Sequence, residues 1–473
     1  MNNSINSRQR LADKIKNGAV LLHSGSIVYR NNDTWYPFRQ DSNFYYLTEW
    51  PEPDAHAVIL IKNSEPELHL FVQDRNEEME TWEGKRLGQS GAVDEYDASK
   101  AYSFQDYEKI LPNLLRGFND IYCDYSSNNF EKHDKKILTH AVPYDQRGAD
   151  FSNATLHSLQ PLVSELRLIK SEGEIELLTK ACDITVEGHI HAMKTTNTGM
   201  YEYQVGAEME KIFYDRGAER LGYPSIVAGG HNACILHYST NRDQLDDGNL
   251  LLIDAAAEYG MYSSDVTRTF PVSGKFTSPQ KDVYEEVLRV QNEGVEGVVV
   301  GNSMKEVHQQ TIKTLSESLV NLKLVPLGVE ETISMMHFFE FFMHGTGHWL
   351  GLDVHDAGSY EVNGKPRVFE HGMVTTIEPG IYVRPTKPVI EFPLLERDPN
   401  EIRERRKIMG MEKATKLEKE EMKNAKTVKH EIPKDLLGIG VRIEDDIVCT
   451  TNGPTNLTEN APKTIEEIEA VTA

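Results

Sequence analysis

The segment 251–270, LLIDAAAEYGMYSSDVTRTF, places two aspartates on a predicted β-hairpin. With the turn centred on Tyr259 and Gly260, Asp254 and Asp265 are equally far from it and lie opposite each other, with Cβ atoms ~4.5–5.5 Å apart. Small and apolar neighbours disfavour an exposed hairpin with unrelated acids. Because two carboxylates so close repel unless a cation neutralises them, the hairpin predicts a fold that encloses metal, at a spacing that suits two ions ~3.5–4 Å apart.

A glycine-rich motif with three histidines, HGTGHWLGLDVHD, occupies residues 344–356. His344 and His348 have the spacing of two ligands on one helical face, but the two glycines between them disfavour a helix. We therefore expect a loop that brings backbone and imidazoles close to a ligand. His348 is the predicted metal ligand, and His344 and His355 are expected to contact substrate.

Two further carboxylates end short strand-like runs. In MVTTIEPGIYV, Glu378 precedes a Pro-Gly turn, and a carboxylate at a strand end faces a cleft more often than a core. In GIGVRIEDDIV, strand alternation places Arg442 and Glu444 on one face and Asp445 on the other. We therefore choose Glu444 as the ligand, with Arg442 beside it.

Together the motifs supply four carboxylates and one imidazole, which suit two divalent cations in a hydrolase. Oxygen-rich ligation with one nitrogen favours Mn²⁺ over Zn²⁺, because zinc prefers more nitrogen or sulfur. The predicted metal ligands are Asp254, Asp265, His348, Glu378 and Glu444.

The composition disfavours several classes of protein. The net charge of −24 opposes binding to nucleic acid and to anionic membranes. The four cysteines form no CxxC pair and fit free thiols in a reducing cytoplasm. No apolar stretch approaches the ~18 residues of a membrane span, and no signal peptide is visible. We expect a cytoplasmic protein.

The length of 473 residues predicts two or three domains. Residues 1–165 read as a mixed α/β domain, with strand-like runs at 57–61 and 68–72. Residues 166–473 read as an α+β domain with an antiparallel sheet. In this second domain the expected helices are 172–195, 201–216, 279–300 and 303–321, and the expected strands are 249–257, 264–271, 373–377, 380–384 and 439–449.

The combined motifs resemble the aminopeptidase P family of pita-bread metallopeptidases, over nearly the whole chain. Besides the aspartate hairpin and the histidine loop, the resemblance rests on FRQDSNFYYLTEW (38–50), CILHYSTN (234–241), IEPGIY (377–382) and GVRIEDD (440–446). It implies an N-terminal α/β domain and a C-terminal α+β pita-bread domain whose curved sheet holds the metals. It also implies a homo-oligomer, a dimer or a tetramer.

The resemblance implies a role for each site residue. Asp254 would bind one metal, Asp265 and Glu444 would bridge both, and His348 and Glu378 would bind the other. Glu378 would also be the general base. His237 and His355 would steady the scissile carbonyl. The proline-side pocket would be lined by His344, Arg442 and Tyr223.

The implied activity is release of the N-terminal residue from peptides with proline second. An Xaa-Pro dipeptidase of the same fold would share the metal set and is the nearest alternative. Methionine aminopeptidase, creatinase-like hydrolysis and a non-catalytic binding protein are disfavoured by the large N-terminal domain and the intact ligand set.

The chain departs from the family pattern in places. Ser263 and Ser264 precede the second aspartate where the family usually has Gly, and Gly347 precedes the ligand histidine where it often has Ser. A charged insertion at about 385–437 separates the two glutamate motifs. Within it, residues 399–430 are dense in Lys, Arg and Glu and predict a solvated helix or a mobile loop.

Overall fold

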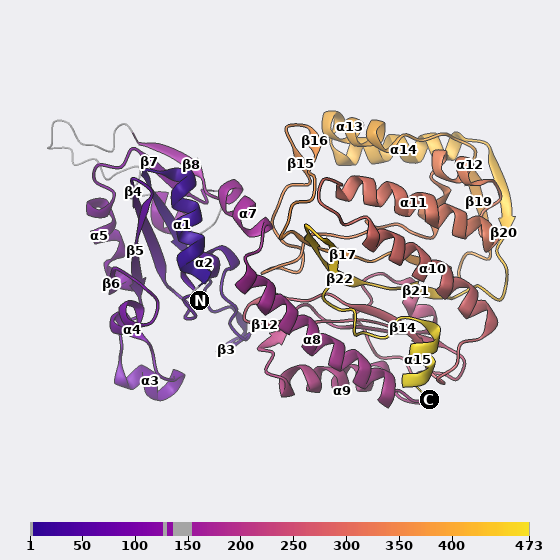
Figure 1. Ribbon diagram of the computed structural model, residues 1–473, viewed down its shortest axis with the longest axis horizontal. Helices are drawn as coiled ribbons and strands as arrows, with labels where there is room; N and C mark the ends of the chain where they lie inside the picture. Colours follow the sequence, from indigo (N-terminus) through magenta and orange to yellow (C-terminus); the bar gives the residue numbers. More distant parts are fainter. Residues whose placement is uncertain (1–2, 126–129, 136–153, 473) are drawn as a thin grey trace. The chain divides into compact units, whose positions relative to one another are not determined.

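The computed structural model describes residues 3–125, 130–135 and 154–472 (Figure 1). They divide into two compact units, Met1–Gly173 and Glu174–Ala473. The division lies eight residues after the expected boundary at residue 165, because helix α7 (Gln160–Leu168) belongs to the first unit. Each unit has its own cluster of buried apolar side chains, as a domain requires.

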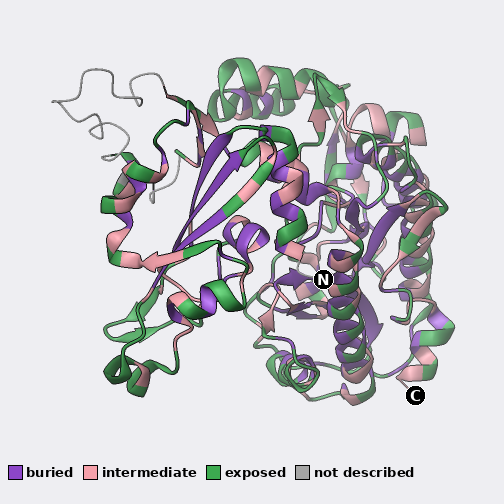
Figure 2. Cartoon of the chain, turned by 60° about the vertical axis from the view of Figure 1, so that its left-hand side comes forward, coloured by how far each residue is buried: buried purple, intermediate pink, exposed green. Residues whose placement is uncertain are grey.

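The first unit is a mixed α/β domain around a six-stranded sheet of order β6-β5-β4-β1-β7-β8. The β1–β4 and β4–β5 pairs are antiparallel, and the other three are parallel. Its central strands are buried along most of their length (Figure 2). The sheet comprises β1 (Gly18–His23), β4 (His56–Lys62), β5 (Glu65–Val72), β6 (Lys100–Ser103), β7 (Asp120–Cys123) and β8 (Thr155–Ser158), and the main helices are α1 (Asn3–Ile15), α2 (Ser42–Thr48), α4 (Gly88–Asp94) and α5 (Tyr107–Leu114).

The long helices of the second unit occupy the positions expected from the sequence. They are α8 (Glu172–Thr195), α9 (Glu202–Asp215), α10 (Ser278–Glu296) and α11 (Met304–Asn321). Helix α10 begins with a capping box, in which Thr277 and Gln280 exchange hydrogen bonds between side chain and backbone. Among the described residues, no helix has both the length and the apolar character needed to cross a membrane.

The strands of the second unit pair antiparallel, as expected. Two predicted strands are each split in two: 249–257 into β11 and β12, and 439–449 into β21 and β22. The carboxylates of the site lie beside these interruptions. The strands around the site are β10 (Ile226–Gly229), β11 (Leu250–Asp254), β12 (Ala257–Tyr259), β13 (Tyr262–Ser263), β14 (Thr267–Pro271), β17 (Val374–Ile377), β18 (Gly380–Tyr382), β21 (Gly440–Arg442), β22 (Asp445–Thr450) and β23 (Gly453–Asn456).

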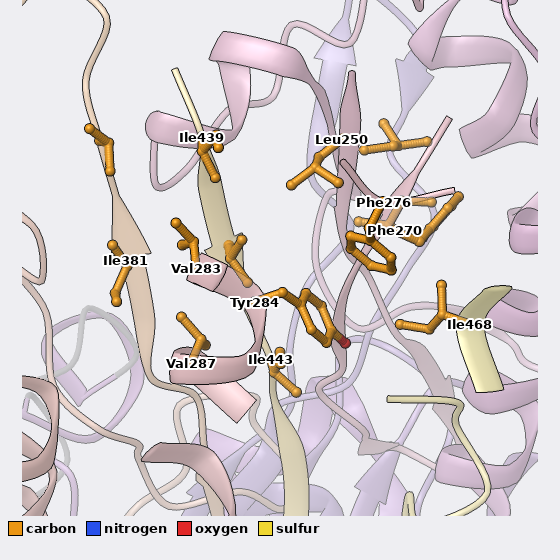
Figure 3. Close-up of a cluster of buried hydrophobic side chains, with 14 of the residues drawn as sticks. Leu250, Phe270, Phe276, Val283, Tyr284, Val287, Ile381, Ile439, Ile443 and Ile468 are labelled. Atoms are coloured by element: carbon orange, nitrogen blue, oxygen red, sulfur yellow. The ribbon is translucent and has the colours of Figure 1, made fainter. Parts of the chain in front are cut away.

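Helix α10 packs against these strands and fixes their position. Figure 3 shows Val283, Tyr284 and Val287 on the helix with Ile381 and Ile443 from the strand segments nearby. All five are fully buried, and burial of each such side chain stabilises the fold by ~1.5–3 kcal/mol. The apolar face of α10 therefore supports the strand segments that bear the later carboxylates.

The charged insertion is a helical hairpin on a two-stranded ribbon. Strands β19 (Val389–Pro393) and β20 (Thr427–Glu431) pair antiparallel. Between them lie α13 (Pro399–Met409) and α14 (Met411–Asn424), which are largely exposed. The solvated-helix interpretation of this segment is therefore the one that matches the structure.

Candidate active site

A cavity of about 420 Å³ lies in the second unit where the split strands meet. It gathers side chains from hairpins and loops that are far apart in the sequence. All ten residues singled out from the sequence line it: Tyr223, His237, Asp254, Asp265, His344, His348, His355, Glu378, Arg442 and Glu444.

The aspartate hairpin exists, but its register differs from the expected one. Asp254, the last residue of β11, lies opposite Thr267 rather than Asp265. The turn is centred on Gly260 and Met261, whose φ angles are 56° and 70°, as in the tight turns that suit hairpins. The expectation of directly opposed aspartates was therefore wrong, because the turn lies one residue further along the chain.

The aspartates nevertheless share a face. A shift of the turn by one residue moves the pairing by two positions, and strand side chains repeat every two residues. Asp265 therefore lies diagonal to Asp254, in the gap between β13 and β14. Its place in this gap frees its backbone from regular strand pairing.

The hydroxyl of Tyr223 lies between the two aspartates. It is 2.6 Å from Asp254 Oδ1 and 2.5 Å from Asp265 Oδ1. A hydroxyl carries one proton and can donate to only one carboxylate at a time. The second close contact between oxygens therefore requires another proton or a cation.

A second pair of carboxylates lies at the other split strand. The β17–β22 and β18–β21 pairs share one register, which places Glu378 opposite Glu444 at the break between them. Glu444 accepts a hydrogen bond from Thr267 Oγ1 at 2.6 Å. Glu378 Oε1 lies 3.7 Å from His348 Nε2. The interrupted aspartate hairpin thus contributes two acids, and the interrupted pairing of β17 and β18 with β22 and β21 contributes the other two.

Three candidate ligands meet closely. One ligand atom from each of Asp265, His348 and Glu444 lies within 4.8 Å of the other two. His348 Nε2 is 3.3 Å from Asp265 Oδ2. Asp254 adjoins this group through the hydroxyl it shares with Asp265, and Glu378 adjoins it through His348.

Burial leaves these negative charges poorly compensated. Desolvation raises the pKa of Asp265 and that of Glu444, and it raises the pKa of Glu378 to about 7. Burial opposes a charged imidazole at His348, but the hydrogen bond and charge of Asp265 prevail and raise its pKa to about 9. Without a cation, burial therefore favours the protonated forms of Glu378 and Glu444, and the hydrogen bond between Asp265 and His348 favours a proton on the imidazole.

The donor set fits divalent cations. Four acidic side chains line the cavity, and the described cations facing them are Arg442 and the protonated His348. Carboxylates with one imidazole are the ligands that Mn²⁺ and similar ions accept. Two divalent ions would release the protons and neutralise the acids.

His344, Tyr382 and Arg442 form a hydrogen-bonded row on one wall. Arg442 Nη1 donates to the Tyr382 hydroxyl at 3.0 Å, and that hydroxyl lies 2.8 Å from His344 Nε2. Arg442 Nη2 also donates to Asp254 Oδ2 at 2.5 Å. Burial and the charge of Arg442 lower the pKa of His344 to about 3. This imidazole is therefore neutral and can present its ring to an apolar group.

His237 and His355 are exposed residues of the cavity lining. The His355 ring meets that of His348 edge to face, with centroids 4.4 Å apart. Its ring is partly shielded from water, and this desolvation and the charge of His348 lower the pKa of His355. A neutral imidazole at this position can donate a hydrogen bond to a bound molecule.

Three further residues complete the polar network and were not singled out from the sequence. Thr267 donates to Glu444, Tyr382 links His344 to Arg442, and the Asp446 carboxylate accepts from the backbone N–H of Asp265. Thr267 follows Asp265 by two residues, and Tyr382 ends the IEPGIY run. Strand alternation could have marked both as facing the site, but it does not reveal their partners.

The chain is similar to known proteins along its length. Residues 176–451 match metallopeptidase family M24, and residues 5–122 match the aminopeptidase P N-terminal domain. It is 39% identical to the Xaa-Pro aminopeptidase of Haemophilus influenzae, over 96% of this chain and 93% of that protein. It is 36% identical to that of Escherichia coli, over 98% of this chain and 96% of that protein. The structure of Pseudomonas aeruginosa aminopeptidase PepP matches with a TM-score of 0.85 at 35% identity, over 99% of this chain and 97% of that one.

Proposed function

The chain belongs to metallopeptidase family M24 and is an Xaa-Pro aminopeptidase, and we propose that the cavity described above is its active site. Its second unit has the pita-bread fold of that family. The observation that carries the proposal is the convergence of all ten predicted residues on one cavity, with four acids beside a single candidate imidazole ligand.

The enzyme uses divalent metal, and we propose two ions, both Mn²⁺. Asp254 would hold one ion, His348 and Glu378 the other, and Asp265 and Glu444 would contact both. Such ions, when bound, lower the pKa of water and polarise a carbonyl group. The four carboxylates of this set would supply the negative charge that two divalent ions require.

Glu378 is the proposed general base. It would accept a proton from the attacking water and pass it to the proline nitrogen as the peptide bond breaks. The departing nitrogen leaves as a neutral secondary amine only after it gains this proton. Glu378 is partly exposed at the cavity and 3.6 Å from His344 Nδ1, so its carboxylate reaches toward the proposed proline pocket.

The proposed selectivity follows from the chemistry of proline. The bond before proline is a tertiary amide without an N–H group, so a site that binds peptides by strand pairing loses a hydrogen bond there. The neutral ring of His344, supported by Tyr382, offers an apolar surface for the pyrrolidine ring. Arg442 and Tyr223 complete the proposed pocket. His237 and His355 would donate to the carbonyl oxygen as it gains negative charge.

The enzyme acts on peptides, and we propose a cytoplasmic homo-oligomer, a dimer or a tetramer. The four cysteines are free, which suits a reducing compartment. Light scattering of the purified protein measures the number of subunits directly.

A comparison of matched substrates tests the proposed pocket. Tripeptides with proline or alanine second should differ by at least ~10-fold in kcat/KM, since each 1.4 kcal/mol of transition-state discrimination is a tenfold ratio. His344→Ala should reduce turnover of the proline peptide more than that of the alanine peptide. Equal losses for both peptides would remove His344 from the proline pocket.

A further inference from the structure

Asp265 lies in a strand break, so its backbone needs a partner from outside the ladder. Its N–H donates to Asp446 Oδ2 at 2.9 Å. Asp446 belongs to β22 and follows Glu444 by two residues. A buried backbone N–H is nearly always hydrogen-bonded, and here a side chain supplies the acceptor that a neighbouring strand supplies elsewhere.

Asp446 is an unusual choice of acceptor in a protein interior. The residue is fully buried, and the other described donor to its carboxyl group is the thiol of Cys182, at 3.3 Å from the same oxygen. Its second oxygen, Oδ1, has no hydrogen-bond partner among the described residues. A buried polar atom without a partner costs ~1–3 kcal/mol. Stability alone therefore gives no reason for a carboxyl group here.

The strand that carries Asp446 is held rigidly from its opposite face. Asp445 forms a fully buried ion pair with Arg268, at 2.6 Å. Arg268 Nη1 also donates to the backbone oxygen of Glu444 at 2.6 Å. Asp445 accepts three more hydrogen bonds, each at 2.8 Å, from Gln291, Thr458 and Lys463. These contacts fix the start of β22, and with it the position from which Asp446 contacts Asp265.

We propose that Asp446 is a positioning residue for Asp265, which the proposed function places in contact with both metals. This inference rests on that function. Asp446 contacts the backbone of the ligand rather than a metal or a peptide, and it fixes where the Asp265 carboxylate enters the site. The same strand thereby supplies one ligand, Glu444, and aligns a second.

Asp446→Ala tests the proposal by metal affinity rather than by activity. The variant should bind Mn²⁺ about 10- to 100-fold more weakly, the usual cost of losing a group that orients a ligand. The readout is competition with a fluorescent chelator on metal-stripped full-length protein. Asp446→Asn keeps a side-chain oxygen for the Asp265 N–H and should recover affinity to within about threefold.

Cys182→Ala is the matched control, because it removes the other donor to the same oxygen and leaves the Asp265 contact in place. It should bind Mn²⁺ as the wild type does. Wild-type affinity in folded Asp446→Ala would overturn the proposal. If that variant does not fold, Asp446→Asn decides: a loss of tenfold or more in the folded protein would contradict a role as acceptor.

The two proposals fail in different ways. A wild-type protein that binds no Mn²⁺ would refute the proposed metal site itself. A wild type that binds Mn²⁺ with an unaffected Asp446→Ala would refute only the positioning role.

Discussion

Glu444 lies opposite Glu378 in the register shared by two antiparallel strand pairs, at the point where both pairs are interrupted. Desolvation raises the pKa of both carboxyls, and that of Glu378 to about 7. Asp254 and Asp265 lie beside the other interrupted hairpin and share one hydroxyl. Acids held in this way repel each other when ionised, and divalent cations relieve the repulsion.

Glu378→Ala should abolish most turnover without unfolding the protein. Loss of a general base usually lowers kcat by about 10²–10⁴-fold. The carboxyl of Glu378 is partly exposed and lies near the imidazoles of His344 and His348. Its truncation should leave the thermal midpoint of the metal-stripped protein nearly unchanged at pH 5, where this carboxyl is largely protonated. Steady-state hydrolysis of a proline-second tripeptide by metal-loaded protein measures the rate, and a thermal melt of the metal-stripped protein measures the stability. A near-wild-type rate would remove Glu378 from the mechanism.

In the metal-stripped protein, the contribution of the raised site carboxyls and of His348 to the stability of the second unit should fall as pH rises from about 4.5 to about 9. Glu378 has a folded pKa of about 7, above its usual value of 4.5, so the stability it contributes is present below 4.5 and lost as pH rises through 7. The pKa values of Asp265 and Glu444 are shifted in the same direction. His348, raised from 6.5 to about 9, extends the loss to higher pH.

Added Mn²⁺ should reverse this trend, because metal binding requires deprotonated ligands and strengthens as pH rises. The gap between the thermal midpoints of metal-loaded and metal-stripped protein should therefore widen between pH 5.5 and pH 8. Glu378→Gln removes one titrating group and should flatten the metal-stripped curve near pH 7. A gap that stays constant over this range would contradict the account.

Tyr223→Phe should destabilise the metal-stripped protein more than the metal-loaded one. The hydroxyl is the described donor between Asp254 and Asp265, and a hydrogen bond to a charged group contributes ~1.5–3 kcal/mol. Bound cations take over this role, so the loss should shrink when Mn²⁺ is present. Denaturant titrations with and without metal measure the difference. An equal loss in both states would show that the hydroxyl stabilises the fold rather than compensating the acids.

The first unit should lose stability on acidification through its buried histidines. His56 lies opposite His23 in the sheet, with Nδ1 atoms 2.7 Å apart, and the ring of His133 meets both. Burial and the neighbouring charges of His23, His133 and Lys132 lower the pKa of His56 to about 2. The unfolded chain then binds the extra proton below pH 6.5, at a cost of about 1.4 kcal/mol for each pH unit.

Tryptophan fluorescence reports this transition, because Trp35, Trp50 and Trp82 belong to the first unit and only Trp349 to the second. His56→Gln keeps a hydrogen-bonding side chain without the titration. It should show a shallower loss of stability between pH 6.5 and pH 5. A slope equal to that of the wild type would assign the acid sensitivity to other groups.

The alternation of residues along the strands predicted which side chains face the cavity, but it did not predict the pairing register of the aspartate hairpin. Strand alternation assigned Glu444 rather than Asp445 to the cavity, and the structure places Asp445 in the ion pair behind the strand. The aspartate register was missed because the turn places Met261 at a positive φ, which a non-glycine residue adopts only at a steric cost. No local pattern in the sequence signals that choice.

Partners far apart in the sequence were also beyond prediction. Tyr382 links His344 to Arg442, and Asp446 accepts from Asp265, through contacts that depend on how the two interrupted hairpins meet. The α/β character of the first unit and the long helices of the second were predictable, because hydrophobic periodicity is a local property.

The most direct test of the account is hydrolysis of an Xaa-Pro-Yaa tripeptide and of the matching Xaa-Pro dipeptide by metal-stripped protein, with and without Mn²⁺. We expect release of the first residue from the tripeptide only when metal is added, with slower cleavage of the dipeptide. Faster cleavage of the dipeptide would indicate an Xaa-Pro dipeptidase. Cleavage of neither peptide by metal-loaded protein would contradict the proposed active site.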